Sequence, residues 1–152
     1  MTKRDTIFSN PRKEITKSPL YYFHDLGFRN YGLGLFGQVN RIDGFGFLFE
    51  NMVFNTIVDT IRYTGAAVHY WRTKDGAEVD FVLSYGDRVL PVEVKYKRLG
   101  KPFVSRSFYN FIEKYKPPEA ILVNLSLEKT EFAGDTKVNY TPFYRLPELL
   151  AD

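Results

Sequence analysis

Apolar residues along the chain recur with two different periods, and the order of these periods predicts a mixed α/β fold. Stretches with helical spacing are interspersed with stretches in which every second residue is apolar. Glycine and proline mark the boundaries, since Gly65 ends the first helical stretch and Pro117 and Pro118 end the second. The elements predicted in this way are a helix at residues 47–64, strands at 66–72, 77–84 and 88–97, a helix at 104–115 and a strand at 119–126.

The segments outside this α-β-β-β-α-β order carry weaker patterns. Residues 1–18 are polar and basic without a clear period, and we interpret them as a loose leader or the remnant of a linker. Residues 21–24 are a short aromatic strand candidate, followed by a glycine-rich, aromatic connection. A last strand at 138–144 and a short terminal helix opened by Pro147 complete the pattern. We therefore predict a single domain at residues 19–152, with a mixed central sheet flanked by helices.

Composition limits the classes of protein to which the chain can belong. Its 152 residues are 44% hydrophobic and 17% aromatic, which is enough apolar material for a real core. The absence of cysteine excludes disulfides and thiolate metal sites and favours a cytoplasmic location. The longest apolar runs are too short to cross a bilayer, so no membrane partner is expected.

The charge of the chain permits a polyanionic partner without requiring one. Lysine and arginine exceed aspartate and glutamate by 21 to 18. One short stretch holds many of these cations, and it is either a phosphate-contacting patch or a solvated loop. The candidate nucleic-acid contacts in this stretch are Lys97, Arg98, Lys101 and Arg106. Tyr70, Trp71 and Arg72 are further candidates, with ordinary sheet packing as the alternative for the two aromatic rings.

A glycine motif at residues 32–37 does not predict a nucleotide site. It matches the dinucleotide-binding pattern G-x-G-x-x-G, but that site needs a strand directly before the motif and a helix starting within it. Residues 38–46 have the pattern of a loop. Because a phosphate-loop signature is also absent from the sequence, we expect no bound nucleotide and no ATP hydrolysis by this chain.

The hairpin at residues 77–97 brings charged residues together. A tight turn at Gly86 and Asp87 pairs Tyr85 with Arg88, which in turn sets Asp80 opposite Glu93. Alternation predicts a core face made of Val79, Phe81, Leu83, Leu90, Val92 and Val94. It predicts an opposite face made of Glu78, Asp80, Glu93 and Lys95.

Two opposed carboxylates destabilise a sheet unless one is protonated or a cation lies between them. A hard divalent cation with oxygen ligands suits Asp80 and Glu93. Lys95 lies on the same face, where it would position a water molecule or offset negative charge. The alternative for Lys95 is a plain cross-strand ion pair with Glu78.

Glu50 lies on the apolar stripe of the first predicted helix, in line with Phe54, Ile57 and Ile61. A carboxylate in that position needs a partner or a shifted pKa. We expect it to point toward Asp80 and Glu93. The alternative is that it lies in the first turn, where the helix dipole favours an acid.

At this point the sequence resembles the PD-(D/E)xK nuclease superfamily, whose fold is that of restriction endonucleases. The resemblance rests on a helix that bears Glu50, on Asp80 in the second strand, and on the run Glu93–Val94–Lys95 in the third. The usual proline before the first acid is replaced by Val79. This likeness implies Mg²⁺ or Mn²⁺ bound by Asp80, Glu93 and the Val94 carbonyl, with Glu50 acting directly or through water, and with Lys95 as the catalytic cation.

A narrower resemblance covers nearly the whole chain from Lys17 onward. The segments YYFHDLGFRN, GFLFENMVFN, YWRTKDGAEVDFVL and VEVK look like the C-terminal domain of bacterial and archaeal AAA-type ATPases of unknown function. In that family the domain follows an ATPase module, which implies an ATPase partner in the same or a longer chain.

The residues and the resemblance together leave two hypotheses for the function. One is a metal-dependent phosphodiesterase that acts on DNA through Glu50, Asp80, Glu93 and Lys95. The other is a catalytically silent module on the same scaffold, used by an ATPase for DNA binding or protein docking. The sequence indicates neither the strand preference nor the oligomeric state.

Overall fold

A computed structural model of the chain describes residues 2–3, 5–6, 21–38 and 44–151. Most of the expected leader, residues 7–18, lies outside the described residues. Within it, two dipeptides form strands: β1 (Thr2–Lys3) pairs with β3 (Tyr21–Tyr22), and β2 (Asp5–Thr6) pairs with β4 (Ala67–Arg72). The start of the chain therefore contacts the domain at two points.

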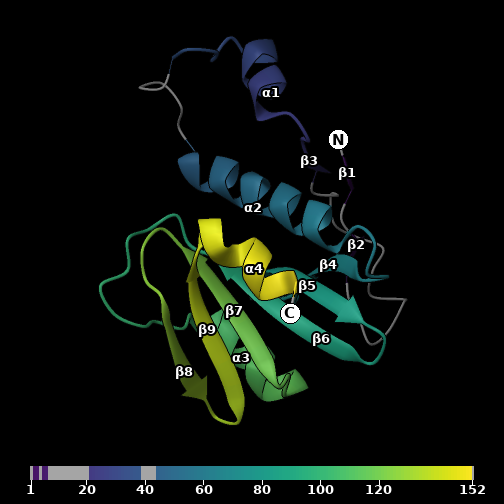
Figure 1. Ribbon diagram of the computed structural model, residues 1–152, viewed down its shortest axis with the longest axis vertical. Coiled ribbons are helices and arrows are strands. Elements are labelled where there is room, and N and C mark those ends of the chain that lie inside the picture. The colour runs from purple at the N-terminus through teal and green to yellow at the C-terminus, as the bar shows by residue number, and fades with distance from the viewer. Residues whose placement is uncertain (1, 4, 7–20, 39–43, 152) are drawn as a thin grey trace.

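A mixed sheet forms the centre of the domain (Figure 1). Its order is β2-β4-β5-β6-β7-β9-β8, with the two-residue β2 at one edge and six longer strands beside it. β6 and β7 run parallel because a helix, α3, crosses over between them, whereas β4, β5 and β6 are antiparallel neighbours. The longer strands beyond β4 are β5 (Glu78–Tyr85), β6 (Arg88–Val94), β7 (Glu119–Asn124), β8 (Lys129–Ala133) and β9 (Thr136–Pro142).

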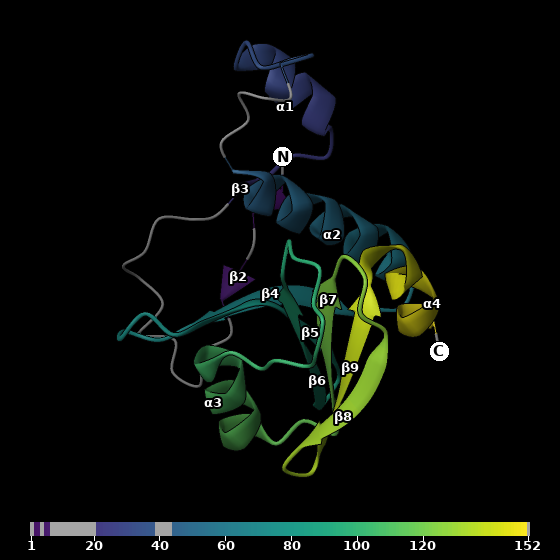
Figure 2. The ribbon, with the colours of Figure 1, turned by 90° about the vertical axis from the view of Figure 1, so that its left-hand side faces the viewer.

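Helices cover both faces of the sheet (Figure 2). α2 (Phe45–Ile61) and α4 (Leu146–Ala151) lie on one face, and α3 (Arg106–Tyr115) lies on the other. A short 3-10 turn, η3 (Phe143–Arg145), leads into α4. Each face has its own hydrophobic core, one built around Phe54, Ile57 and Phe81 and the other around Phe108 and Phe111. The mixed α/β class and the predicted order α-β-β-β-α-β are confirmed.

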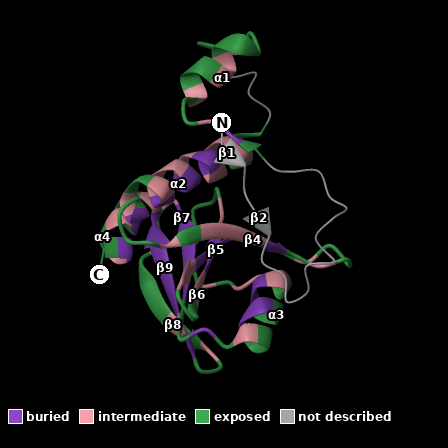
Figure 3. Cartoon of the chain, turned by 90° about the vertical axis from the view of Figure 1, so that its right-hand side faces the viewer, coloured by how far each residue is buried: buried purple, intermediate pink, exposed green. Residues whose placement is uncertain are grey.

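Several elements differ from the prediction, and the two main additions lack a buried periodic face. The helix α1 (Leu26–Gly32) occupies the expected glycine-rich connection and buries none of its residues (Figure 3). The edge strand β8 was also not predicted, since its residues are exposed or half-buried. β6 ends at Val94 rather than at residue 97.

The predicted hairpin register is confirmed as far as it is paired. Tyr85 lies opposite Arg88, Leu83 opposite Leu90, and Phe81 opposite Val92. Gly86 adopts φ 57° in the turn, a conformation that a residue without Cβ reaches at low cost.

The predicted core face is wrong at Val79, because β5 carries a β-bulge. His69 pairs with Val82 and Trp71 with Val79, so β5 has one more residue than β4 in this interval. Phe81 and Leu83 belong to the core under α2, whereas Val79 belongs to the core under α3. Asp80 lies within this irregular stretch, where the alternation of faces changes phase.

None of the described helices is long and apolar enough to cross a membrane.

Candidate functional site

Asp80 lies where the ladder between β5 and β6 ends. The last paired residues are Phe81 and Val92, and beyond them the Asp80 carboxylate accepts a hydrogen bond from the backbone N–H of Val94, with 2.7 Å between Oδ2 and N. A side chain thus replaces a strand as the acceptor for that amide. This contact ties the first acidic residue to the run Glu93–Val94–Lys95.

Glu93 is buried, with 3% of its surface exposed, and it has two polar partners. Its Oε1 lies 2.7 Å from Nζ of Lys95, and it accepts a hydrogen bond of 2.9 Å from the hydroxyl of Ser105. Ser105 is also the N-cap of α3, since its hydroxyl accepts from the N–H of Phe108. Both contacts use Oε1. Among the described residues, no hydrogen bond or ion pair is made by Oε2 of Glu93.

Glu50 is half-buried on α2, and the hydroxyl of Tyr22 donates a hydrogen bond to its Oε1. Tyr22 is fully buried and stacks on Phe54, so its hydroxyl position is fixed by packing. The first-turn alternative for Glu50 is wrong, because α2 begins at Phe45 and has no acidic residue in its first turn. Its position on the apolar stripe instead brings its charge within reach of Asp80.

The electrostatics show that these acids act on one another. The pKa of Asp80 is raised to about 7, first because burial removes hydration, and then because Glu50 and Glu93 carry negative charge nearby. The amide of Val94 and the cation of Lys95 act in the opposite direction and offset only part of this rise. Asp80 is therefore only about half ionised at pH 7 in the metal-free protein, and a cation bound there would favour its ionised form.

Lys95 remains a cation in this environment. Burial alone would lower its pKa, but the ion pair with Glu93 and the charges of Asp80 and Glu78 outweigh burial and raise the pKa above its ordinary value. The ion pair of Lys95 is with Glu93 and not with Glu78, the partner in the alternative interpretation. Glu78 lies instead across from Arg72, with 3.6 Å between carboxylate and guanidinium.

The donor atoms of the site suit a hard divalent cation. Within the part of the chain that the structure describes, no group of three or more histidine or acidic side chains is arranged to hold a metal ion. The candidate oxygens are those expected from the sequence, the carboxylates of Asp80 and Glu93 and the backbone carbonyl of Val94, and they are of the donor type that Mg²⁺ and Mn²⁺ prefer. The fit is favourable electrostatically, because a cation there would offset the repulsion that raises the pKa of Asp80.

The predicted nucleic-acid contacts separate into buried and exposed residues. Trp71 is only 4% exposed, and its indole N–H donates to the hydroxyl of Tyr115 at 3.2 Å, so sheet packing describes this ring. Tyr70 is half-buried. The cations are all exposed: Arg72, Lys97, Arg98, Lys101 and Arg106.

Sequence reasoning missed the residues that support the acids. Ser105, Tyr22 and Asn51 carry no charge and match no motif by themselves. Asn51 is fully buried, accepts from the N–H of Phe23 and donates to its carbonyl, and so holds the segment of Tyr22 against α2. The available signal for Ser105 was its place as an N-cap three residues before Phe108.

The glycine motif at residues 32–37 lies at the end of α1. Gly34 and Gly37 have positive φ, and the preceding element is a helix, not the strand that a dinucleotide site requires.

Comparison with protein families gives one match. The family described as "Domain of unknown function (DUF4143)" matches residues 45–146, the range that runs from the start of α2 to the start of α4. A comparison with curated proteins finds no match.

Proposed function

The chain belongs to the DUF4143 family, whose description assigns no chemistry, and from its own site we propose that it is a Mg²⁺-dependent DNA phosphodiesterase domain on a PD-(D/E)xK nuclease-like core. The observation that carries the proposal is the charge around Asp80. Burial of Asp80 (β5), together with the negative charges of Glu50 (α2) and Glu93 (β6), raises the pKa of Asp80 to about 7, and Lys95 offsets only part of this rise. Carboxylates with strongly shifted pKa values cluster at functional sites, and a bound cation would offset the cost of ionising Asp80.

The residues divide the work of phosphodiester hydrolysis among them. Asp80, Glu93 and the Val94 carbonyl would hold the metal, with Glu50 reaching it through water. A bound Mg²⁺ supplies polarisation of the phosphoryl oxygen and a lower pKa for water. Lys95 stays charged and lies at the edge of the site, where it would hold the attacking water or stabilise the charge that develops on the phosphate. Tyr22 and Ser105 would keep Glu50 and Glu93 in position.

A second candidate is a catalytically silent module of an AAA-type ATPase, used for DNA binding or docking. It is favoured by the contacts of Glu93, whose Oε1 is already satisfied by Lys95 and Ser105 without a metal. In that case the acidic centre is a structural ion-pair network, and no divalent cation is needed.

We expect the purified chain to cleave DNA when Mg²⁺ or Mn²⁺ is present. Supercoiled plasmid should be converted to nicked and linear forms, and single-stranded and branched oligonucleotides should be shortened, with EDTA stopping each reaction. Glu93→Gln, purified in parallel, is the control for contaminating nuclease. The phosphodiesterase proposal is wrong if wild type gives no product from any substrate, or if Glu93→Gln gives as much product as wild type. A catalytically silent module would then be the better description.

The rate of cleavage should also depend on pH through Asp80. At subsaturating metal, the Asp80 proton competes with the cation, because its pKa is raised to about 7 in the metal-free protein. The rate should therefore rise by up to about tenfold per pH unit below pH 7 and level off above it. Raising the metal concentration should move this rise to lower pH. A rate that is independent of pH between 5.5 and 8 at low metal would show that Asp80 does not bind the cation.

A further inference from the structure

A groove of about 610 Å³ lies between α3 and the turn that joins β4 to β5. Its volume is in the range of small-molecule sites, so it holds a short stretch of a polymer or a compact ligand. One wall is the exposed side of α3, and the other is the turn at residues 73–77. The residues that decide its chemistry are Arg106, Ser107, Asn110 and Lys114 on α3, with Thr73 and Asp75 on the turn.

The α3 wall is positively charged along its length. Arg106 and Lys114 are eight residues apart and fall within about 80° of each other around the helix axis, so they lie on one side about 12 Å apart. The two cations are therefore far enough apart to contact different phosphates of the same strand. Neither cation forms an ion pair with any residue that the structure describes, and Lys114 lies 5.0 Å from the centroid of the Tyr115 ring, a contact that leaves its charge uncompensated. Asn110 and Ser107 add neutral hydrogen-bonding groups between them.

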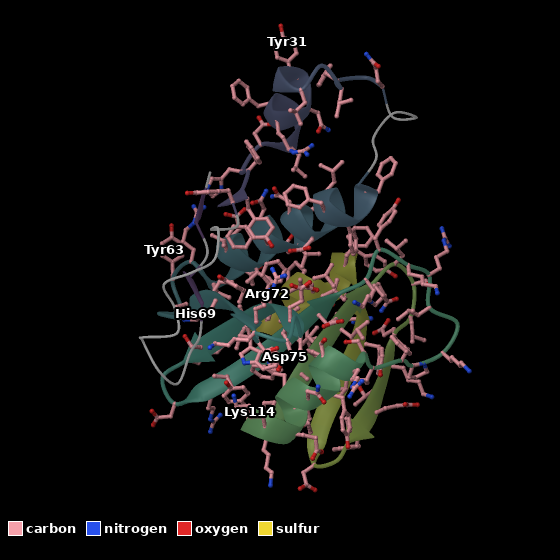
Figure 4. All side chains as sticks on the ribbon, turned by 180° about the vertical axis from the view of Figure 1, so that it is seen from behind. Tyr31, Tyr63, His69, Arg72, Asp75 and Lys114 are labelled. Atoms are coloured by element: carbon pink, nitrogen blue, oxygen red, sulfur yellow. The ribbon has the colours of Figure 1, made fainter. Side chains whose placement is uncertain are left out.

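The opposite wall contributes one carboxylate to the groove lining, that of Asp75, whereas Lys74 of the same turn does not line the groove. Asp75 is exposed on the turn, and it lies on the same side of the sheet as Lys114 (Figure 4). A carboxylate repels phosphate but accepts hydrogen bonds from base amino groups such as cytosine N4. A single strand has phosphates along one edge and base edges along the other, which matches a groove with one basic and one acidic wall.

The start of α3 links the groove to the acidic centre along the chain. Ser105 hydrogen-bonds Glu93 at 2.9 Å, and the next two residues, Arg106 and Ser107, line the groove. A phosphate held at the Arg106 end therefore lies on the side of the groove nearest to Glu93.

We propose that this groove binds one strand of DNA, with its phosphates against Arg106 and Lys114 and its base edges toward Asp75. This proposal extends the proposed function by naming single-stranded DNA as the bound form. Only the expectation that the strand runs toward Glu93 depends on the proposed phosphodiesterase activity. Binding in the groove requires no metal and no turnover, so the two proposals fail separately.

The test is binding of a fluorescently labelled 20-nucleotide DNA strand to the whole chain in EDTA, followed by anisotropy. The double variant Arg106→Gln/Lys114→Gln removes both groove cations. The matched control Arg62→Gln/Lys129→Gln removes two exposed cations at the end of α2 and on β8, and so changes the net charge equally. Loss of two phosphate contacts should reduce the slope of log K against log[salt] by about 1.4 and weaken binding roughly 25-fold at 0.1 M salt. The control should bind as wild type does.

Four outcomes with DNA, and a fifth with RNA, overturn the proposal. The four are no binding by wild type, equal binding by the groove variant and wild type, equal loss in the groove variant and the control, and a loss seen only with duplex DNA. A matched RNA strand is the last arm, and tighter binding of RNA than DNA would overturn the assignment to DNA. Strand binding that is normal while cleavage is absent would leave the groove supported and the phosphodiesterase rejected.

Discussion

Asp80→Asn is expected to make the metal-free protein more stable at pH 8, by roughly 2–4 kcal/mol in the free energy of unfolding. Folding raises the pKa of Asp80 from 3.8 to about 7, which means that the folded state must hold an ionised carboxylate that it disfavours. Asparagine has nearly the same shape and carries no charge. Its amide oxygen can still accept the hydrogen bond from Val94.

The pH window of this effect follows from the two pKa values. The folded state binds the Asp80 proton more tightly than the unfolded state, so this group adds stability below pH 3.8 that is lost as the pH rises to about 7. The difference between Asp80→Asn and wild type should therefore be small near pH 4, grow between pH 4 and pH 7, and stay constant above. Urea unfolding in EDTA at several pH values measures it.

The matched control is Asp87→Asn in the exposed hairpin turn, which should change stability by less than about 0.5 kcal/mol at every pH. Asp80→Asn that is less stable than wild type at pH 8, or a difference that does not grow with pH, would show that the neighbouring acids do not destabilise the Asp80 carboxylate.

Glu93→Gln and Lys95→Gln should both reduce DNA cleavage by at least about 100-fold, but they should have opposite effects on metal binding. Glu93→Gln removes a carboxylate ligand, so the affinity for Mn²⁺ measured by calorimetry should fall about tenfold or more. Lys95→Gln removes a cation that lies 2.7 Å from Glu93, so the affinity should stay the same or increase. The contrast separates a metal ligand from a residue that stabilises charge or positions water.

Thermal unfolding, measured in the same calorimeter, checks that both variants are folded. Glu93 is buried and accepts from Ser105, and the glutamine oxygen can keep that bond. Ser105→Ala is a further comparison, since it removes the hydroxyl but leaves both charges. Equal metal affinity in Glu93→Gln, Lys95→Gln and wild type would contradict the assignment of Glu93 as a ligand.

The local periodicity of apolar residues was enough to predict the hairpin and the position of Glu50. The Gly86–Asp87 turn fixes the register of β5 against β6, and both strands are adjacent in sequence. Helical spacing placed Glu50 on the buried stripe, whatever the first residue of α2. The start of α2 was not predicted correctly because Phe45 lies between two glycines. The N-cap is Gly44, with φ 109° and no side chain that could form a capping hydrogen bond, so no capping residue marks the start in the sequence.

Contacts between distant segments explain what the sequence did not predict. The bulge in β5 is defined only by its pairing with β4, so no alternation within β5 alone reveals it. The partners of the acids, Tyr22 and Ser105, come from β3 and from the start of α3, 28 and 12 residues away from the carboxylates they contact. α1 buries none of its residues, and a helix without a buried face leaves no periodic pattern to detect.

The extra residue divides β5 into two halves in which the alternation of faces has opposite phase. Val79 faces the core under α3, whereas Phe81 and Leu83 face the core under α2. An insertion or deletion of one residue between the bulge and the hairpin turn would turn Phe81 and Leu83 away from the core under α2, so the length of that half is constrained by packing. Asp80 stands at the junction, where neither phase of the alternation dictates an apolar side chain. The position of Asp80 is therefore enclosed by the domain without being required for core packing. The residue type at this position can be selected for its chemistry.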